Sequence, residues 1–218
     1  MLGLFDSGGG GLNTVRYIKK NAPWIDLVYQ IDRNNAPYGI KTREEIIDIT
    51  QKNIKELIDR GAEKVLIACC TASSVHEDID EECRKTSIPI ISPIVKEALT
   101  TTKNRKIAVI ATERTVKSHV FGNMLGEYLA GEFSTQDIVA MVDNGINDCT
   151  ISEKTFERLK NMLSCLGGTD ADTLILGCTH FPSLINSIGE IADGFGIKYI
   201  IDSSQIGAKA LIKYQTEN

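Results

Sequence analysis

The chain has 218 residues, of which 42% are hydrophobic and 24% are charged, and its formal net charge is −5. These proportions are typical of a globular protein with one large domain or two small ones, and they exclude a disordered, collagen-like or coiled-coil chain. The mild negative charge and the lack of basic clusters exclude nucleic acid and anionic membranes as favoured partners, and no run of about 20 apolar residues predicts a membrane helix.

The cysteine content favours an intracellular protein. Six cysteines, at positions 69, 70, 83, 149, 165 and 178, are few for a disulfide-rich secreted protein of this length. The first residues lack the basic flank and the long apolar run of a signal peptide. We therefore expect reduced thiols and a cytoplasmic location.

Short apolar runs alternate with amphipathic stretches in the first half of the chain. Strands are predicted at residues 2–5, 27–31, 65–68 and 88–91. Helices are predicted at residues 12–20, 42–59 and 73–85, and another begins near Pro93. Gly61 is placed to end the second of these helices.

The same alternation continues in the second half. Strands are predicted at residues 107–111, 138–142, 173–176 and 198–201, and helices at 115–129, 152–166, 183–192 and 206–214. Repeated strand–helix units of this length predict parallel sheets with helices on both faces. The strands are continuous apolar runs, as expected for parallel strands that are covered on both faces.

Two segments indicate that the halves are related. Residues 65–69 and 174–178 each consist of four apolar strand residues followed by a cysteine, with Thr71 or Thr179 close behind. The two cysteines are separated by half the length of the chain. We infer two similar α/β lobes, covering residues 1–95 and 96–203, with a C-terminal helix at about 204–218 that packs back on the first lobe.

Polar residues follow the predicted strands at six places, namely 6–9, 35–39, 69–71, 112–115, 143–145 and 178–180. Because open α/β sheets bind ligands beyond the carboxyl ends of their strands, one shared cleft is favoured over six unrelated turns. The loop at 6–11 precedes a helix, so its N–H groups could face an anion. It lacks both the GxGxxG and the P-loop patterns, which disfavours mononucleotide binding.

The cysteines and histidines do not have the spacing of a structural metal site. Cys178 and His180 could form half of one, completed by Cys69 and Cys70, but no CxxC pair occurs. Each cysteine could instead be a small buried hydrophobe, and His180 could bond only locally at a helix start. His76 and His119 lie in helical patterns away from strand ends, and we interpret both as structural.

Five segments resemble motifs of the aspartate/glutamate racemase superfamily and occur in that family's order. They are GLFDSGGGGL at 3–12, PYG at 37–39, IACCTAS at 67–73, AVIAT at 108–112 with Thr115, and LGCTHFP at 176–182. The resemblance implies two pseudosymmetric lobes with the active site between them. It also implies racemisation of an acidic amino acid without a cofactor or a metal, with L-glutamate to D-glutamate as the leading reaction.

The resemblance also implies roles for individual residues. Cys69 and Cys178 correspond to the two acid–base thiols, with Asp6 beside the first and His180 beside the second. Residues expected in the substrate pocket are Ser7, Pro37, Tyr38, Gly39, Cys70, Thr71, Thr115 and Thr179. Such enzymes serve peptidoglycan synthesis and are commonly homodimers.

Two positions depart from the family pattern. Cys70 stands where the family usually has asparagine, and a thiol is a weaker donor and acceptor than an amide. Asp143 stands where the family usually has glutamate. Because of Cys70, two alternative functions stay open, namely an aspartate racemase and another isomerase of the superfamily with an altered substrate. A third alternative is a relative that binds an amino acid but has impaired catalysis.

Two thiols suit racemisation because the Cα hydrogen leaves one face and a proton returns to the other, so that neither base has to move. A free thiol has a pKa of about 8.5, and a helix that begins after each cysteine would favour the thiolate. The matched motifs contain no Lys or Arg. Backbone N–H groups and hydroxyls are therefore expected to hold the substrate carboxylates.

Overall fold

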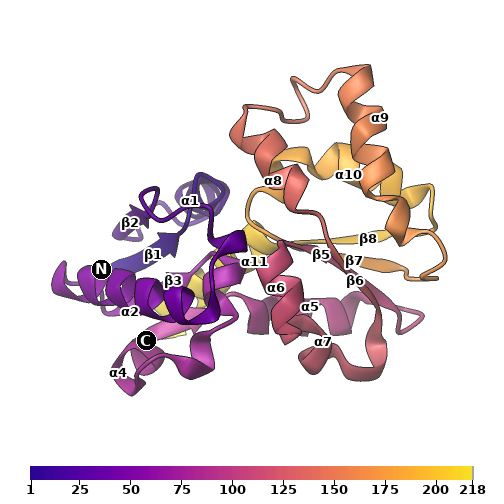
Figure 1. Cartoon of the computed structure of the whole chain (residues 1–218). Coiled ribbons are helices and arrows are strands. Elements are labelled where there is room, and N and C mark those ends of the chain that lie inside the picture. The colour runs from indigo at the N-terminus through magenta and orange to yellow at the C-terminus, as the bar shows by residue number, and fades with distance from the viewer. Residues whose placement is uncertain (218) are drawn as a thin grey trace.

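The structure, a computed structural model, describes residues 1–217 and consists of two α/β lobes (Figure 1). Each lobe contains a four-stranded sheet, with strand order β2-β1-β3-β4 in the first lobe and β6-β5-β7-β8 in the second. Every strand pairing is parallel. The predicted fold class, two similar lobes with parallel sheets flanked by helices, is confirmed.

The first lobe is built around the strands β1 (Leu2–Asp6), β2 (Leu27–Ile31), β3 (Lys64–Ile67) and β4 (Ser87–Pro89). Its helices are α1 (Gly11–Asn21), η1 (Tyr38–Ile40), α2 (Arg43–Asp59), α3 (Cys70–Ser73), η2 (His76–Asp78) and α4 (Glu81–Thr86). Helix α2 begins where its sequence predicts, because Thr42 and Glu45 form a reciprocal capping box.

The second lobe is built around β5 (Ile107–Ala111), β6 (Leu129–Ser134), β7 (Thr173–Gly177) and β8 (Tyr199–Asp202). Helix α5 (Ile91–Thr101) leads into it, and its other helices are α6 (Glu113–Ser118), α7 (Val120–Leu125), η3 (Gly126–Tyr128), α8 (Gln136–Asp143), α9 (Glu153–Met162), η4 (Ser164–Leu166), η5 (Phe181–Leu184) and α10 (Ile185–Asp193). The chain ends in α11 (Ser203–Glu217).

In the second lobe, one predicted element is wrong and one strand was not predicted. Residues 138–142, predicted as a strand, lie within helix α8, and the strand β6 lies at the end of the predicted helix 115–129. A run of five apolar residues fits a buried strand and a helix equally well. Strand β6 is half-buried at the edge of its sheet and contains Gly131 and Glu132, so its sequence gives no clear strand pattern.

Two predicted helices are interrupted. Helix 115–129 breaks at His119 and Gly126, which both have positive φ. The stretch 73–85 is broken into short pieces because Ile79 is extended and Asp80 caps a new helix through the Cys83 amide.

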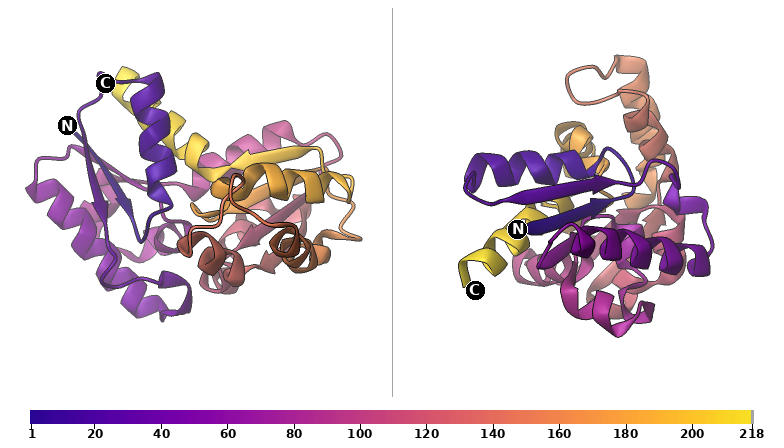
Figure 2. Two further views of the ribbon diagram at one scale, coloured as in Figure 1. Left: turned by 90° about the horizontal axis from the view of Figure 1, so that it is seen from above. Right: turned by 90° about the vertical axis from the view of Figure 1, so that its left-hand side faces the viewer.

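The two lobes share part of their hydrophobic core. One cluster joins Leu2 and Leu66 of the first sheet to Val109 and Ile175 of the second, and Leu211 of α11 belongs to it. Helix α11 packs against both α1 and α5, and Figure 2 shows it leaving the second lobe and running alongside α1 towards the C-terminus. The proposed division at residues 95 and 203 stays a prediction; residue 218 lies outside the described part.

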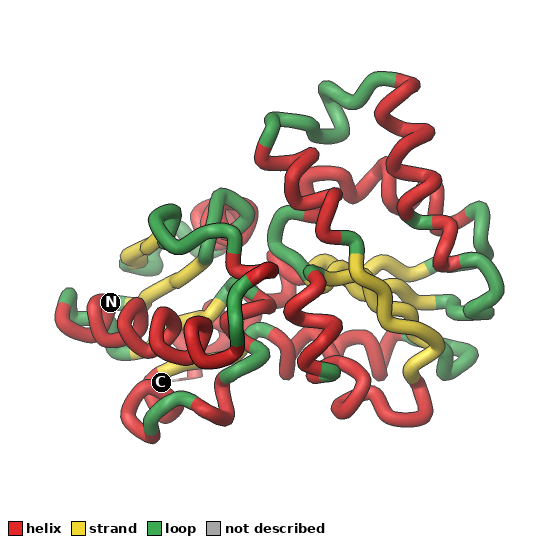
Figure 3. Tube along the Cα trace, in the orientation of Figure 1, coloured by secondary structure: helices red, strands yellow, loops and turns green. Residues whose placement is uncertain are grey.

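Figure 3 shows the strands of the two lobes as two separate yellow groups, and the two sheets place their strands in equivalent order. Strand β3 of the first lobe and β7 of the second occupy the same position, next to the central strands β1 and β5. The segments that follow β3 and β7 carry Cys69 and Cys178. Within residues 1–217, no helix combines the length and the hydrophobicity that crossing a bilayer requires.

Candidate active site

A cleft of about 660 Å³ lies between the lobes, and residues of both lobes line it. The first lobe contributes residues that follow the carboxyl ends of β1, β2 and β3, and the second contributes Thr112, helix α8 and the segment after β7. Of the predicted site residues, Ser7, Pro37, Tyr38, Gly39, Cys69, Cys70, Thr71, Asp143, Cys178, Thr179 and His180 line this cleft.

The Cys69 thiol lies just after β3, directly before helix α3, and is 5% exposed. Its Sγ is 3.2 Å from Ser7 Oγ, so the hydroxyl fixes the position of the sulfur. Burial and then the negative charge of Asp6 raise the pKa of this thiol to about 11, against the opposing effects of Ser7 and the α3 amides.

The Cys178 thiol lies just after β7 and is 6% exposed. Its Sγ is 3.6 Å from Nδ1 of His180, and His180 Nε2 lies 3.0 Å from Asp143 Oδ1. The second pair is at ion-pair distance, although its angles do not make a hydrogen bond. Burial raises the pKa of Cys178, and the backbone amide of His180 only partly opposes this rise.

The amides that follow Cys69 and Cys178 favour the thiolates, as expected, but burial has the larger effect and the pKa of each thiol is raised. Helix α3 has four residues, and the segment after Cys178 leads into the four-residue 3-10 helix η5. Such short helices present few aligned amides, and the loss of hydration in the buried cleft outweighs them.

Asp6 lies behind the cleft surface and is fully buried. Its Oδ1 accepts a hydrogen bond of 2.8 Å from the Gly8 amide, while Oδ2 makes no hydrogen bond of standard geometry to the described residues. Burial raises the pKa of Asp6, opposed mainly by the charge of His180 and the Gly8 amide. A carboxyl with a raised pKa and a free oxygen can hold a proton beside the cleft.

The glycine-rich loop brings the lobes together. A Cβ atom on Gly10 would lie 2.6 Å from the Thr179 carbonyl carbon and 2.8 Å from the His180 nitrogen. Asn13 of α1 also reaches across, with Nδ2 3.4 Å from the Thr179 carbonyl oxygen. The Gly8 amide already donates to Asp6, so not every N–H group of the loop is available to bind an anion.

Three threonine hydroxyls connect the lobes beneath the cleft. Thr71 Oγ1 is 2.9 Å from Thr112 Oγ1 and 3.2 Å from Thr115 Oγ1, and the last two are 2.9 Å apart. Thr71 and Thr112 line the cleft, but Thr115 is fully buried and does not. Thr115, expected in the pocket, therefore positions Thr71 and Thr112 from behind.

The wall formed by Pro37, Tyr38 and Gly39 is held in place by Asp32. The Asp32 Oδ2 accepts hydrogen bonds from the Tyr38 hydroxyl at 2.7 Å and from Asn53 Nδ2 at 3.1 Å. Burial raises the pKa of Asp32, but hydrogen bonds, chiefly from Tyr38 and Asn35, outweigh it and lower the pKa. Asp32 is thus an anionic acceptor that ties the wall to helix α2.

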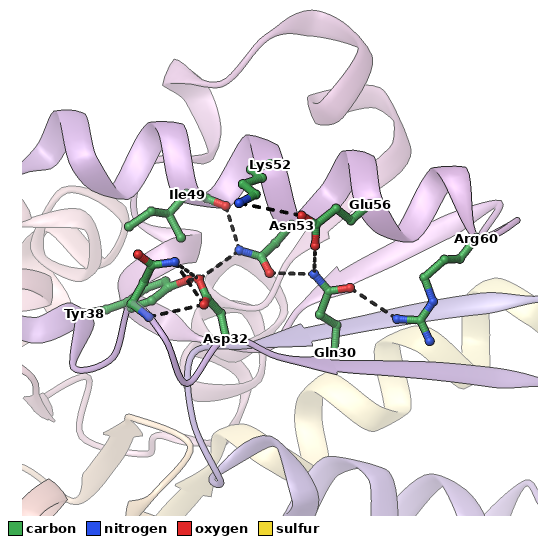
Figure 4. Close-up of polar contacts among 9 residues, drawn as sticks. Gln30, Asp32, Tyr38, Ile49, Lys52, Asn53, Glu56 and Arg60 are labelled. Carbon is green, nitrogen blue, oxygen red and sulfur yellow. Dashed lines mark hydrogen bonds and ion pairs between the residues drawn. The ribbon is translucent and has the colours of Figure 1, made fainter.

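The network around Asp32 continues away from the cleft, as Figure 4 shows. Gln30 Nε2 donates to Asn53 Oδ1 and to Glu56 Oε2, both at 2.7 Å. Arg60 then donates to Gln30 Oε1 at 3.3 Å. Strand β2, helix α2 and the Tyr38 wall are therefore linked by side-chain hydrogen bonds.

Cys70 is the third thiol of the cleft and is 2% exposed. Burial, and then the proximity of Cys178 and Cys69, raises its pKa well above the ordinary value, so it is present as a neutral thiol. The described residues contain no group of three or more His, Cys, Asp or Glu side chains placed to hold a metal ion.

The other two histidines do not line the cleft. His76 Nε2 is 3.2 Å from Ser87 Oγ, which agrees with the structural role predicted for it. His119 has positive φ and lies 3.6 Å from Glu132 Oε2.

The sequence does not predict several of the residues that line the cleft, namely Asn13, Arg16, Arg33 and Gln136, whereas Thr112 belongs to a predicted strand-end segment. The matched motifs contain no arginine, and the two arginines that line the cleft, Arg16 and Arg33, lie outside those motifs. Arg33 comes two residues after β2 ends, so the rule that ligands bind beyond strand ends could have found it. Arg16 lies in α1, beyond the matched loop.

Comparisons with known proteins agree with this architecture. The model of the Asp/Glu/Hydantoin racemase family matches residues 15–211. Glutamate racemase of Aquifex aeolicus is 35% identical over 214 residues, which are 96% of this chain and 81% of that protein. Glutamate racemase of Ralstonia pickettii is 36% identical over 88% of this chain and 68% of that protein.

Solved structures show the same fold. Glutamate racemase from Francisella tularensis, determined in complex with D-glutamate, matches with a TM-score of 0.87 and 30% identity, over 100% of this chain and 81% of that one. Aspartate racemase of Picrophilus torridus matches with a TM-score of 0.68 at 23% identity, over 99% and 94% of the two chains, and shows the fold alone. By its sequence and its two-lobed fold, the chain belongs to the Asp/Glu/Hydantoin racemase family.

Proposed function

We propose that this protein is a cofactor-independent amino-acid racemase that interconverts L- and D-glutamate, with Cys69 and Cys178 as its acid–base pair. The observation that carries the proposal is that the two thiols follow equivalent strands, β3 and β7, and line one cleft. The relatives of similar sequence are glutamate racemases, which supports glutamate as the substrate.

The proposed reaction needs one sulfur on each face of the substrate Cα. One cysteine, as thiolate, removes the Cα proton, and the other, as thiol, delivers a proton to the opposite face. The roles exchange in the reverse direction. Ser7 steadies Cys69, and His180 lies within reach of Cys178 to accept or return its proton.

The proposed substrate contacts come from both lobes. Thr71 and Thr179 line the cleft and offer hydroxyl donors, and the Tyr38–Gly39 segment offers backbone N–H groups. Fixed donors of this kind stabilise the negative charge that develops as the Cα proton leaves. Asp143, beside His180, would keep that imidazole oriented.

The test is proton exchange at Cα, followed by NMR in D₂O together with optical rotation. The wild-type protein should exchange the Cα hydrogen of L- and D-glutamate and cancel the rotation of either. Cys69→Ala and Cys178→Ala should each abolish racemisation. A variant that racemises at the wild-type rate would overturn the assignment of its thiol.

Aspartate is the second candidate substrate, and the observation in its favour is the Cys70 side chain in the cleft. Glutamate and aspartate differ by one methylene, which a binding site distinguishes by about 1–3 kcal/mol. Parallel exchange assays on both amino acids decide between them. Tight binding of D-glutamate without exchange, restored to turnover by Cys70→Asn, would instead indicate an impaired binding relative.

The proposed reaction would supply D-glutamate for peptidoglycan, in the cytoplasm. A homodimer, which the family resemblance implies, stays a prediction that sedimentation of the purified protein tests. Neither point alters the assignment of the two thiols.

A further inference from the structure

Two arginines stand on the first-lobe side of the cleft. Arg16 belongs to α1 and Arg33 follows β2, and both are exposed and line the cleft. Among residues 1–217, neither guanidinium has a hydrogen-bond or ion-pair partner. Asp143, the other acidic or basic residue that lines the cleft apart from His180, already lies within ion-pair distance of His180. This rim is therefore positive, although the chain carries a formal charge of −5.

The backbone beneath the arginines is held firmly. Arg33 directly follows Asp32, whose amide donates to the Asp6 carbonyl oxygen at 3.0 Å and whose carboxylate is bonded to Tyr38 and Asn53. Arg16 is in the second turn of α1, and the glycine loop before α1 is packed against the second lobe. The two charges thus have fixed attachment points beside the opening of the cleft.

We propose that Arg16 and Arg33 form an anion-capture rim, which draws the extra carboxylate of a dicarboxylic amino acid into the cleft and favours it over a neutral amino acid. This inference rests on the proposed racemase function and names its charge selectivity. A dicarboxylic amino acid has a net charge of −1, so the acidic protein as a whole repels it. Guanidinium groups stay charged at every working pH, and their long-range attraction raises the local concentration of such a substrate.

The attraction should weaken as salt is added, because the screening length falls from about 30 Å at 0.01 M to about 3 Å at 1 M ionic strength. The neutral donors deeper in the cleft should be much less sensitive to salt. The rim therefore affects capture, measured by KM, and leaves the proton-transfer steps, measured by kcat, nearly unchanged.

The experiment measures Cα exchange of D-glutamate by the wild type and by the Arg16→Gln/Arg33→Gln double variant over this range of salt. The wild type should lose about 5- to 10-fold in kcat/KM as salt rises. The double variant should start at the lower value and depend little on salt, with kcat retained. Arg16→Lys/Arg33→Lys should restore most of the salt dependence because the charges remain.

The matched control is Arg158→Gln/Lys160→Gln on α9, which removes the same net charge from a helix that does not line the cleft. This variant should keep the wild-type salt dependence. Unchanged KM and salt dependence in the rim variant would overturn the proposal. A fall in kcat at constant KM would also overturn it, because the arginines would then act on closure or chemistry.

The experiments distinguish a failure of the proposed racemase function from a failure of the anion-capture rim. If the wild type exchanges no acidic amino acid, the racemase proposal fails, and calorimetric binding of D-glutamate and D-glutamine still tests the rim. The rim predicts tighter binding of D-glutamate at low salt, lost in the Gln double variant. Equal affinity for the two ligands would refute it.

Discussion

The close approach of the lobes at Gly10 gives a sharp test of the two-lobe mechanism. Gly10 has φ −59° and ψ −36°, a conformation that alanine adopts freely, so Gly10→Ala causes no backbone strain. The added methyl would nevertheless lie 2.6 Å from the Thr179 carbonyl carbon and 2.8 Å from the His180 nitrogen, with the Thr179 hydroxyl closer still.

The size of the effect follows from these contacts. Carbon atoms in contact prefer separations of about 3.5 Å, so the two segments must move apart by about 1 Å. The atoms in the way include backbone of the segment that carries Cys178, and they cannot rotate aside. A displacement of about 1 Å between catalytic groups costs about 100-fold in rate, and the overpacking costs about 1–3 kcal/mol of stability.

The assay compares kcat/KM for Cα exchange and the thermal unfolding of three variants. Gly9→Ala adds the same methyl one residue earlier, where nothing lies within 4 Å, and Gly189→Ala on α10 is an equally open site outside the cleft. We expect a loss of about 100-fold in Gly10→Ala only. Wild-type kcat/KM in Gly10→Ala would refute the inference that these contacts set the spacing of the two thiols.

Three further predictions concern charged and titrating groups. Because burial raises the folded-state pKa of Asp6, the contribution of this carboxyl to stability is greatest at low pH and is lost as pH rises. Asp6→Asn should therefore increase the free energy of unfolding by about 0.5–2 kcal/mol at pH 7, measured with denaturant, while losing activity. Equal stability of the variant and the wild type at pH 7 would contradict this. Since the pKa of Cys69 is raised to about 11, wild-type kcat/KM should increase from pH 6 to pH 9, and a rate that is flat over this range would show that thiolate formation is not limiting. Asp32→Asn replaces one acceptor oxygen by an NH₂ group that faces other donors, so it should destabilise the protein by about 1–3 kcal/mol and raise KM. Tyr38→Phe should have smaller effects on both stability and KM. A wild-type KM in Asp32→Asn would show that the wall holds its shape without this carboxylate.

The sequence predicts the central strands and the strand-end cysteines well for a physical reason. Strands β1, β3, β5 and β7 are covered on both faces, so almost every residue must be apolar and the run is visible at once. The edge strand β6 is half-buried and tolerates polar residues and glycine, which removes that signal.

The polar groups around the cleft are harder to predict, because their roles depend on contacts between distant segments. Asp32 follows β2 as an ordinary turn residue would, and its importance appears only when Asn53, 21 positions later, donates to it. The same holds for Thr115, which is a plausible pocket residue by its motif but is packed behind Thr71.

The protonation of the thiols connects the fold to the proposed chemistry. Burial raises the pKa of both Cys69 and Cys178, and the charge of Asp6 raises each further, so both sulfurs are thiols at neutral pH. A substrate whose α-ammonium lies near a sulfur supplies the positive charge that favours the thiolate. We therefore expect D-glutamate to increase the ultraviolet absorbance of thiolate near neutral pH in the wild type and not in Cys69→Ala/Cys178→Ala. No increase on saturation would mean that the proton leaves only during the chemical step, with His180 or Asp6 as its acceptor.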